Sequence, residues 1–306
     1  MSAKINEMVV QRLIDRINET GELPWKKPWT SVSTMPRNLV SKKNYRGVNV
    51  FLLHMMGFSS PWFLSLKQVN ALGGRIRKHE KGNVVTFFKI IEKDDDTADD
   101  GKRSFAMLRY YKVWNAAEQC EGLDGKVPEV EVPKRVHTPI SEVEAVVANM
   151  PCPPHIVHGR RQAASYCPPT DTVSMPSPET FVSGESYFSA LLHECVHATG
   201  SAKRLARKAI MEPNRFGSDP YAKEELVAEL GAAFLCGHCG ILPKTEENST
   251  AYLKGWLARL KADPSMLITA GSQAQKAYDY VLGNLEEKAM AAQPVADGMV
   301  AERKAA

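Results

Sequence analysis

The sequence predicts an α+β protein built from two domains. At 306 residues the chain is longer than one average domain. The first part of the chain is basic and the remainder is acidic. Residues 1–90 hold 15 Lys and Arg against 5 Asp and Glu, whereas the remainder holds 24 against 30. The stretches that resemble long strands lie in the first half, and those that resemble long helices dominate the second.

The domain boundaries follow from where these patterns break off. Residues between the two halves mix Gly, Pro, Val and charge without a helical or strand period, and their prolines predict a short, moderately stiff connection. We expect a mixed α/β domain, a linker, a second domain and a disordered tail over residues 1–120, 121–140, 141–290 and 291–306.

The first half is expected to alternate helices with a pair of strands. An amphipathic helix runs from Ile5 to Ile17 and is stopped by Gly21, after which a proline-rich loop cannot be helical. The pattern next predicts a buried helix, a short helix, and two strands joined by an exposed acidic loop, over 48–56, 62–70, 83–91 and 104–115.

The second half is expected to be mainly helical. Ser141 and Glu144 form a capping box that opens a helix to Met150. Two short strands, two long helices and two further helices are predicted after it, over 155–158, 172–175, 185–199, 221–235, 246–262 and 272–288.

The motif His193-Glu194-Cys195-Val196-His197 lies inside the first of the long helices, for which Ser183 is the candidate N-cap. Residues four apart share one face of a helix, so the two imidazoles can hold one zinc-sized ion. Glu194 is offset by about 100° and is placed to act as general base toward a metal-bound water. We therefore predict a Zn²⁺ site in which Mn²⁺ or Co²⁺ can substitute, with Glu194 as the catalytic residue.

Two histidines leave a tetrahedral ion short of at least one protein ligand. On the second long helix, Glu225 and Glu229 lie four apart and share a face with the small residues Ala228 and Ala232. That face can approach another helix closely, so either glutamate is a candidate ligand. Glu224 points about 100° away and is a weaker candidate.

The pattern Glu225-x-x-Ala228-Glu229 resembles a signature of the zincin metallopeptidases, whose third ligand is often a Glu on a following helix. The resemblance implies that Glu225 is the metal ligand, with Glu229 as the alternative. It also implies that Glu229 accepts a hydrogen bond that orients a ligand histidine.

The basic half interleaves aromatic rings with cations, a combination that suits single-stranded DNA because bases stack on rings while Lys and Arg follow the phosphates. Between Pro24 and Ile90 the only acidic residue is Glu80. Each tryptophan taken singly fits core packing better, but the segment as a whole favours nucleic-acid binding. The candidate DNA contacts are Trp25, Lys26, Lys27, Trp29, Arg37, Tyr45, Arg46, Lys67, Arg75, Arg77, Lys78 and Lys81.

Several segments together resemble the ArdC-type antirestriction proteins, whose N-terminal domain also opens some plasmid TraC-type primases. In the first half these are Pro24–Trp29, Tyr45-Arg-Gly-Val-Asn49, Trp62–Gln68 and the basic turn Gly73–Gly82; in the second they are Asp171–Pro176, Tyr187–Gly200, Arg204-Leu and Tyr221–Glu229. His79 stands where this pattern leads us to expect glycine. The resemblance covers about residues 5–290.

This resemblance implies the fold of the first domain, a zincin-like second domain, binding of single-stranded DNA, and protection of entering plasmid DNA during conjugation. Two functions stay open. One is a metal-dependent peptidase delivered to DNA, with a host restriction subunit as its target; the other is a DNA-coating protein whose metal domain holds structure or a partner. A nuclease is disfavoured, because phosphodiester sites usually use two metals about 4 Å apart.

Composition also bears on the compartment. No apolar run reaches the roughly 18 residues of a membrane span, and the N-terminus lacks the apolar core of a signal peptide. The six cysteines are scattered rather than arranged as a disulfide framework, and Cys236-Gly-His-Cys239 is interpreted as buried thiols at a helix end. We expect a cytoplasmic protein with no membrane contact.

Overall fold

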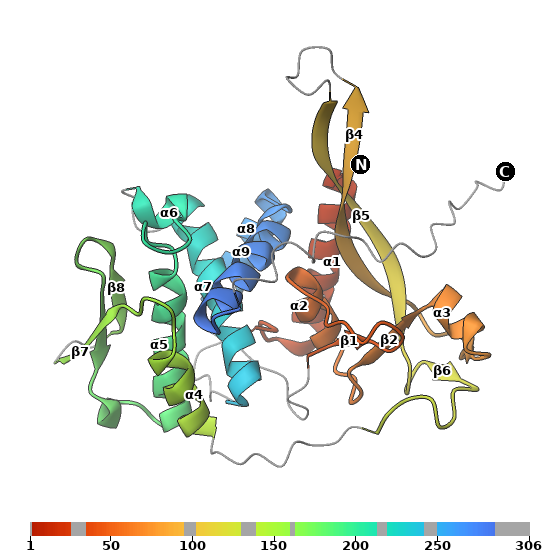
Figure 1. The fold of residues 1–306 in the computed structure, drawn as a ribbon, viewed down its shortest axis with the longest axis horizontal. Coiled ribbons are helices and arrows are strands. Elements are labelled where there is room, and N and C mark those ends of the chain that lie inside the picture. The colour runs from red at the N-terminus through yellow and green to blue at the C-terminus, as the bar shows by residue number, and fades with distance from the viewer. Residues whose placement is uncertain are drawn as a thin grey trace.

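The computed structural model describes residues 2–25, 35–94, 102–129, 139–159, 163–212, 219–241 and 250–284. The predicted tail over 291–306 and residues 130–138 of the predicted linker lie outside these ranges. The described chain mixes helices with small sheets, which confirms the α+β class (Figure 1).

The first half contains a four-stranded sheet in the order β1-β2-β5-β4 and a separate two-stranded ladder of β3 with β6. Strands β2, β5 and β4 are antiparallel neighbours, and β1 runs parallel to β2. The elements are α1 (Ser2–Thr20), β1 (Arg37–Asn38), α2 (Val48–His54), β2 (Trp62–Ser65), α3 (Leu66–Ala71), β3 (Arg75–Ile76), β4 (Asn83–Asp94), β5 (Lys102–Asn115) and β6 (Cys120–Glu121).

The short helix predicted over 62–70 is wrong in its first half. Trp62–Ser65 is strand β2, which pairs with β5 and buries Phe63 and Leu64. The helix begins only after Ser65, whose hydroxyl accepts from the Gln68 backbone while the Gln68 side chain accepts from Ser65 in a capping box. An apolar run this short fits either element, and pairing with β5 decides it.

The second half contains a three-stranded sheet in the order β7-β9-β8, which packs against α5. Both predicted strands are confirmed, and β8 is an additional strand between them in sequence. The elements are α4 (Pro139–Ala148), β7 (His155–Gly159), β8 (Ser165–Cys167), β9 (Thr172–Pro176), α5 (Gly184–Ala198), α6 (Lys208–Met211), α7 (Asp219–Cys239), α8 (Thr250–Ala262) and α9 (Met266–Val281). The last helix begins earlier than the predicted 272–288, after Ser265. It also ends earlier, because Gly283 adopts a left-handed φ of +72° just beyond its end.

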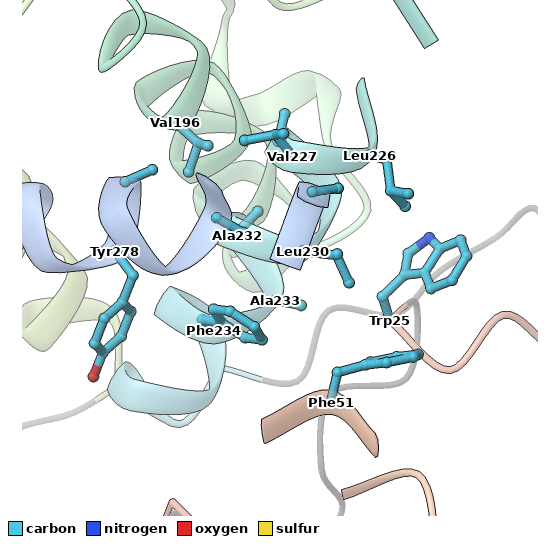
Figure 2. Packing of buried hydrophobic residues seen from close by; sticks show 14 of the residues in the cluster. Trp25, Phe51, Val196, Leu226, Val227, Leu230, Ala232, Ala233, Phe234 and Tyr278 are labelled. Atoms are coloured by element: carbon cyan, nitrogen blue, oxygen red, sulfur yellow. The ribbon is translucent and has the colours of Figure 1, made fainter. Parts of the chain in front are cut away.

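A single hydrophobic cluster joins the two halves. Trp25, only 3% exposed, packs with its ring 5.7 Å from that of Phe51 and 5.6 Å from that of Trp256 in α8. Figure 2 shows Trp25 and Phe51 beside Leu226 and Leu230 of α7. The first half is therefore built onto the helices of the second, and α8 and α9 lie between them.

Polar contacts reinforce this junction where α2 meets α9. Arg46 forms an ion pair with Asp279, and the Gly47 backbone N–H donates to Gln275 at 2.9 Å. Gly271 lies against the start of α2 so closely that an added Cβ would be 2.8 Å from the Val48 nitrogen. Only glycine permits this approach of the two backbones.

Candidate metal centre

The motif helix α5 begins where the sequence predicts. The Ser183 hydroxyl accepts from the Ser186 backbone N–H and caps the helix. His193 and His197 then follow on successive turns of one face, with their Nε2 atoms 3.1 Å apart. The helical spacing alone brings the two nitrogens together.

Helix α7 crosses α5 at a point of close contact. An added Cβ on Gly231 would lie 2.9 Å from both methyl groups of Val196, and Ala228 beside it is fully buried. The expectation that small residues let this helix approach another is met, with Gly231 at the tightest point. The approach places the acidic residues of α7 beside the two histidines.

Glu225 completes a group of three candidate ligands. Its carboxylate oxygens lie 3.6 Å from Nε2 of His193 and 3.6 Å from Nε2 of His197. Among the residues that the structure describes, these three are the one group of His, Cys, Asp or Glu side chains whose ligand atoms lie within 4.8 Å of one another. Glu229 is not part of that group.

The donor set fits a divalent ion of the zinc class. Ligands at about 2.0–2.1 Å from a tetrahedral ion are about 3.4 Å apart, close to the separations found here. Two imidazoles and one carboxylate also leave the fourth position open, as in catalytic sites. The side chains of His193 and Glu225 are 21% and 27% exposed, so these two residues are only partly buried.

The site is strongly polarised. Burial by itself would raise the pKa of Glu225, but hydrogen bonding from His193 and the charges of His197 and His193 lower it to about 2. Burial would lower the pKa of His193, yet the hydrogen bond to Glu225 and the nearby charges of Glu229 and Glu194 raise it. A carboxylate ionised over the whole physiological range is a suitable metal ligand.

Behind His197 lies a buried ion pair that the sequence did not reveal. Glu224 accepts from His197 Nδ1 at 3.2 Å and from Arg207 at 2.6, 3.0 and 3.2 Å. Arg207 also donates to the Val196 carbonyl at 2.7 Å and to the Thr199 hydroxyl at 2.6 Å. Burial raises the pKa of Glu224, but these hydrogen bonds and charges lower it overall.

Glu224 therefore makes at His197 the kind of orienting contact that the family resemblance assigns to Glu229 at a ligand histidine. Its offset of about 100° from Glu225, which weakened it as a ligand, is what turns it toward the far nitrogen of the imidazole. The charge of Glu229 instead lies near His193. The sequence features that could have predicted this ion pair are the two adjacent glutamates and an arginine in the segment between α5 and α7.

Two further groups near the three candidate ligands can exchange protons or donate a hydrogen bond. Glu194, 8% exposed, follows His193 on α5, and Tyr221 hydrogen-bonds to Glu225 from one turn earlier on α7. Burial and the charges of Glu225 and Glu194 raise the pKa of Tyr221 to about 12, so its hydroxyl stays protonated. Tyr221 was recognised in the sequence only as part of the family pattern.

The end of α5 is fixed to the sheet by Arg204. Its guanidinium donates to both carboxylate oxygens of Asp171 at 2.8 and 3.1 Å, and to the Ala198 carbonyl at 2.9 Å. Asp171 adopts a left-handed φ of +49° immediately before β9. This clamp holds the motif helix in register with the three-stranded sheet.

The candidate DNA contacts of the first half differ in how exposed they are. The prediction that Trp25 contacts DNA is wrong. Trp25 is a core residue whose indole packs against the rings of Phe51 and Trp256, so it cannot stack on a base. Tyr45 is half-buried and packs edge-on against Phe63 at 6.2 Å. Lys26, Lys27 and Trp29 lie outside the described residues.

Several of the candidate cations are engaged by the protein itself. Arg46 pairs with Asp279, and Arg75 pairs with Glu121 at 2.6 Å. Arg77 donates to one backbone carbonyl within β6, that of Cys120, and to one before β6, that of Ala117. Arg37 lies over the Trp62 ring at 5.2 Å. The remaining candidates, Lys67, Lys78 and Lys81, are exposed.

The structure also describes His79 in the basic turn and the two cysteines at the end of α7. His79 adopts a φ of +70°, a conformation that glycine tolerates best, at the place where glycine was expected in the basic turn. Cys236 and Cys239 are both buried at the end of α7, and burial raises the pKa of the Cys236 thiol to about 12. Among the described residues, no helix is both long and apolar enough to cross a membrane.

Comparisons with known proteins agree with this geometry. Residues 3–114 match the family model of the N-terminal domain of the anti-restriction factor ArdC, and residues 141–273 match a zincin-like metallopeptidase family. A crystal structure of the antirestriction protein ArdC from plasmid R388 superposes with a TM-score of 0.70 at 32% identity, covering 91% of this chain and 97% of that one. The chain belongs to the ArdC antirestriction family.

Other relatives of this ArdC-family chain differ in length. It is 34% identical over 293 residues to protein y4eC of Sinorhizobium fredii, of which it covers 91%. It is also 32% and 31% identical to two DNA primases TraC of Escherichia coli, but spans only 27% and 20% of their length. A second R388 ArdC structure, with a TM-score of 0.69, contains Mn(II). The zincin-like domain and this Mn(II)-bound relative support a divalent metal at the three-ligand group.

Proposed function

We propose that this ArdC-family protein binds single-stranded DNA, protects incoming plasmid DNA from restriction during conjugation, and holds Zn²⁺ in a peptidase-type centre. The observation that carries the proposal is the convergence of His193, His197 and Glu225 beside Glu194. It occurs in a chain that matches an antirestriction protein over nearly its whole length. Mn²⁺ and Co²⁺ are alternatives for the same nitrogen and oxygen ligands.

The residues around the site suit hydrolysis of an amide bond. A divalent ion in such a site polarises a carbonyl and lowers the pKa of a bound water. Glu194 is placed to accept a proton at its carboxylate and to return it to a leaving amine. Tyr221, protonated at neutral pH, can donate a hydrogen bond to an oxygen that gains negative charge. Membership of the antirestriction family makes a host restriction subunit the substrate that we propose.

A second function is favoured by the shared core. Because the first half packs on α8 and α9, an ion that ties α5 to α7 would stabilise the body on which the DNA-binding half rests. In that case the protein protects DNA by coating it, and the metal centre is structural. Of the two, we regard DNA binding as the more readily demonstrated activity.

Restriction protection in cells separates the two functions. Wild type is compared with Glu194→Gln, which keeps the shape of the side chain but removes the base, and with Glu185→Gln as a control in the first turn of the same helix. The peptidase proposal expects protection to be lost in Glu194→Gln alone, while DNA binding stays unchanged. Equal protection by all three proteins refutes the peptidase role and leaves the binding function.

Binding to DNA is tested on the full chain, since the first half shares its core with the second. Fluorescence anisotropy with a labelled oligo(dT) should show an affinity that falls steeply with salt, through release of counterions from neutralised phosphates. Absence of binding to single strands at 50 mM salt would overturn the DNA-binding part of the proposal.

A further inference from the structure

The long hairpin of β4 and β5 presents two different faces. Residues paired directly across antiparallel strands point to the same side of a sheet, and side chains alternate along each strand. Phe87 pairs with Arg109, Lys89 with Met107, and Ile91 with Phe105. We call the side formed by odd-numbered residues 87–91 and 105–111 the odd face, and the opposite side the even face.

The odd face alternates rings with cations. Phe87 contacts Tyr111 edge-on at 5.7 Å, Arg109 lies opposite Phe87, and Lys89 occupies the next position along β4. Phe105 and Tyr111 are 37% and 41% exposed. Same-side neighbours along a strand are about 6.7 Å apart, a spacing comparable to that of successive nucleotides in an extended strand.

The even face lacks charge over the same length. Phe88, Ile90 and Tyr110 are 52%, 56% and 47% exposed, and the residues paired with the first two are Leu108 and Ala106. Leu108 is buried, since it belongs to the cluster that includes α1. The two faces therefore offer similar rings on the same strands, but over residues 87–91 and 105–111 only the odd face places cations between them; the cation of the even face next to this stretch is Lys112, beyond Tyr110.

The position of the hairpin leaves it accessible. In Figure 1 β4 and β5 rise past α1 and away from the helices of the second half. Of the contacts first suggested by the sequence, Trp25 is in the core and Arg46 is paired with Asp279. Aromatic platforms with interleaved cations are what sequence-tolerant binding of single strands requires.

We propose that single-stranded DNA lies along the odd face of the hairpin, with bases stacked on Phe87, Tyr111 and Phe105 and phosphates held by Lys89 and Arg109. This inference rests on the proposed binding of single-stranded DNA and assigns it a surface. The charge of the odd face favours a polyanion over an apolar protein partner, for which the even face is the better match.

The opposite faces supply matched variants. Phe87→Ala/Tyr111→Ala removes two rings from the odd face, and Phe88→Ala/Tyr110→Ala removes the same two residue types from the even face. In the full chain, the odd-face variant should bind labelled oligo(dT) about tenfold or more weakly, since each stacked base contributes about 5- to 150-fold. The even-face variant should bind as wild type does.

Thermal unfolding establishes that both variants are folded before binding is compared. Since Phe87 and Tyr111 also contact each other, charge supplies an independent test. Lys89→Gln/Arg109→Gln should reduce the slope of log K against log salt by about 0.7 per lost contact. The control Lys112→Gln changes one exposed cation of the even face and should leave the slope unchanged.

Photocrosslinking gives the position directly. A benzoylphenylalanine placed at Met107 on the odd face should crosslink to the oligonucleotide, whereas one at Ala106 on the even face should not. If wild type binds and the two faces respond alike, or the even face responds more strongly, the assignment of the surface is overturned. If wild type does not bind single strands at all, the proposed function itself fails.

Discussion

Replacing Arg207 should separate metal affinity from fold stability. Arg207 and Glu224 are only 7% and 5% exposed, and their side chains make three hydrogen bonds to each other. Arg207→Met preserves much of the side-chain volume but leaves the Glu224 carboxylate buried, where it still accepts from His197 Nδ1.

The expected loss is large. Removing one partner of a buried ion pair costs about 3–5 kcal/mol in unfolding free energy, because an uncompensated charge remains in the interior. Arg207→Met also leaves the Val196 carbonyl and the Thr199 hydroxyl without their guanidinium donor. Urea unfolding of the apo and metal-loaded protein measures the loss, and the midpoint should fall at unchanged slope.

The double variant Arg207→Met/Glu224→Met supplies the control. Replacing both charges by apolar side chains is often nearly neutral, so much of the lost stability should return. Metal affinity should not return, because His197 no longer has a carboxylate at Nδ1, and loss of such a partner typically costs about 10- to 100-fold. Competition with a chromophoric chelator measures that affinity. A stable single variant, or a double variant with wild-type affinity for Zn²⁺, would refute the reasoning.

Three further outcomes are expected. Gly231→Ala should destabilise the fold by about 1–3 kcal/mol, because its new methyl meets both methyls of Val196, and adding Val196→Ala should recover part of the loss in urea titrations. Trp25→Ala should cost about 3–5 kcal/mol in stability while the folded fraction keeps its DNA affinity, which a binding titration corrected for unfolded protein would check. Hydrogen bonding from Arg204 lowers the pKa of Asp171 in the folded protein. The stability that Asp171 contributes is therefore fully present above its unfolded pKa of about 3.9 and is lost as the pH falls through its folded pKa. Asp171→Asn should flatten the dependence of unfolding free energy on pH below about pH 4.

The parts of the site that the sequence predicted are those set by local geometry. The spacing of His193 and His197 on one helix fixes the distance between their nitrogens, and Ser183 fixes where that helix begins. Glu225 followed from family resemblance. The supporting role of Glu224 did not, because it depends on Arg207 folding back from a loop to neutralise a second buried carboxylate.

The parts that the sequence did not predict depend on partners distant in the chain. The ring of Trp25 can stack on a base or fill a core, and only the presence of Trp256 beside it decides between them. The segment at Trp62 became a strand through its pairing with β5, although its composition suits a helix equally well. Composition located the basic half correctly without showing which of its faces stays open.

The shared core also changes how the two halves can cooperate. The linker predicted over 121–140 suggested that a stiff connection keeps the metal centre near bound DNA. In the structure, α9 packs on α7, which carries Glu225, and meets α2 at Gly271, so packed helices connect the candidate metal ligand to the first half. A strand held on the hairpin would then be held at a fixed orientation to the metal centre, because the α2–α9 contact and the ion pair of Arg46 with Asp279 resist rotation of one half against the other. A protein attached to the bound DNA strand would then approach Glu194 from one direction. This fixes its orientation as well as its local concentration, whereas a tether alone raises only the concentration.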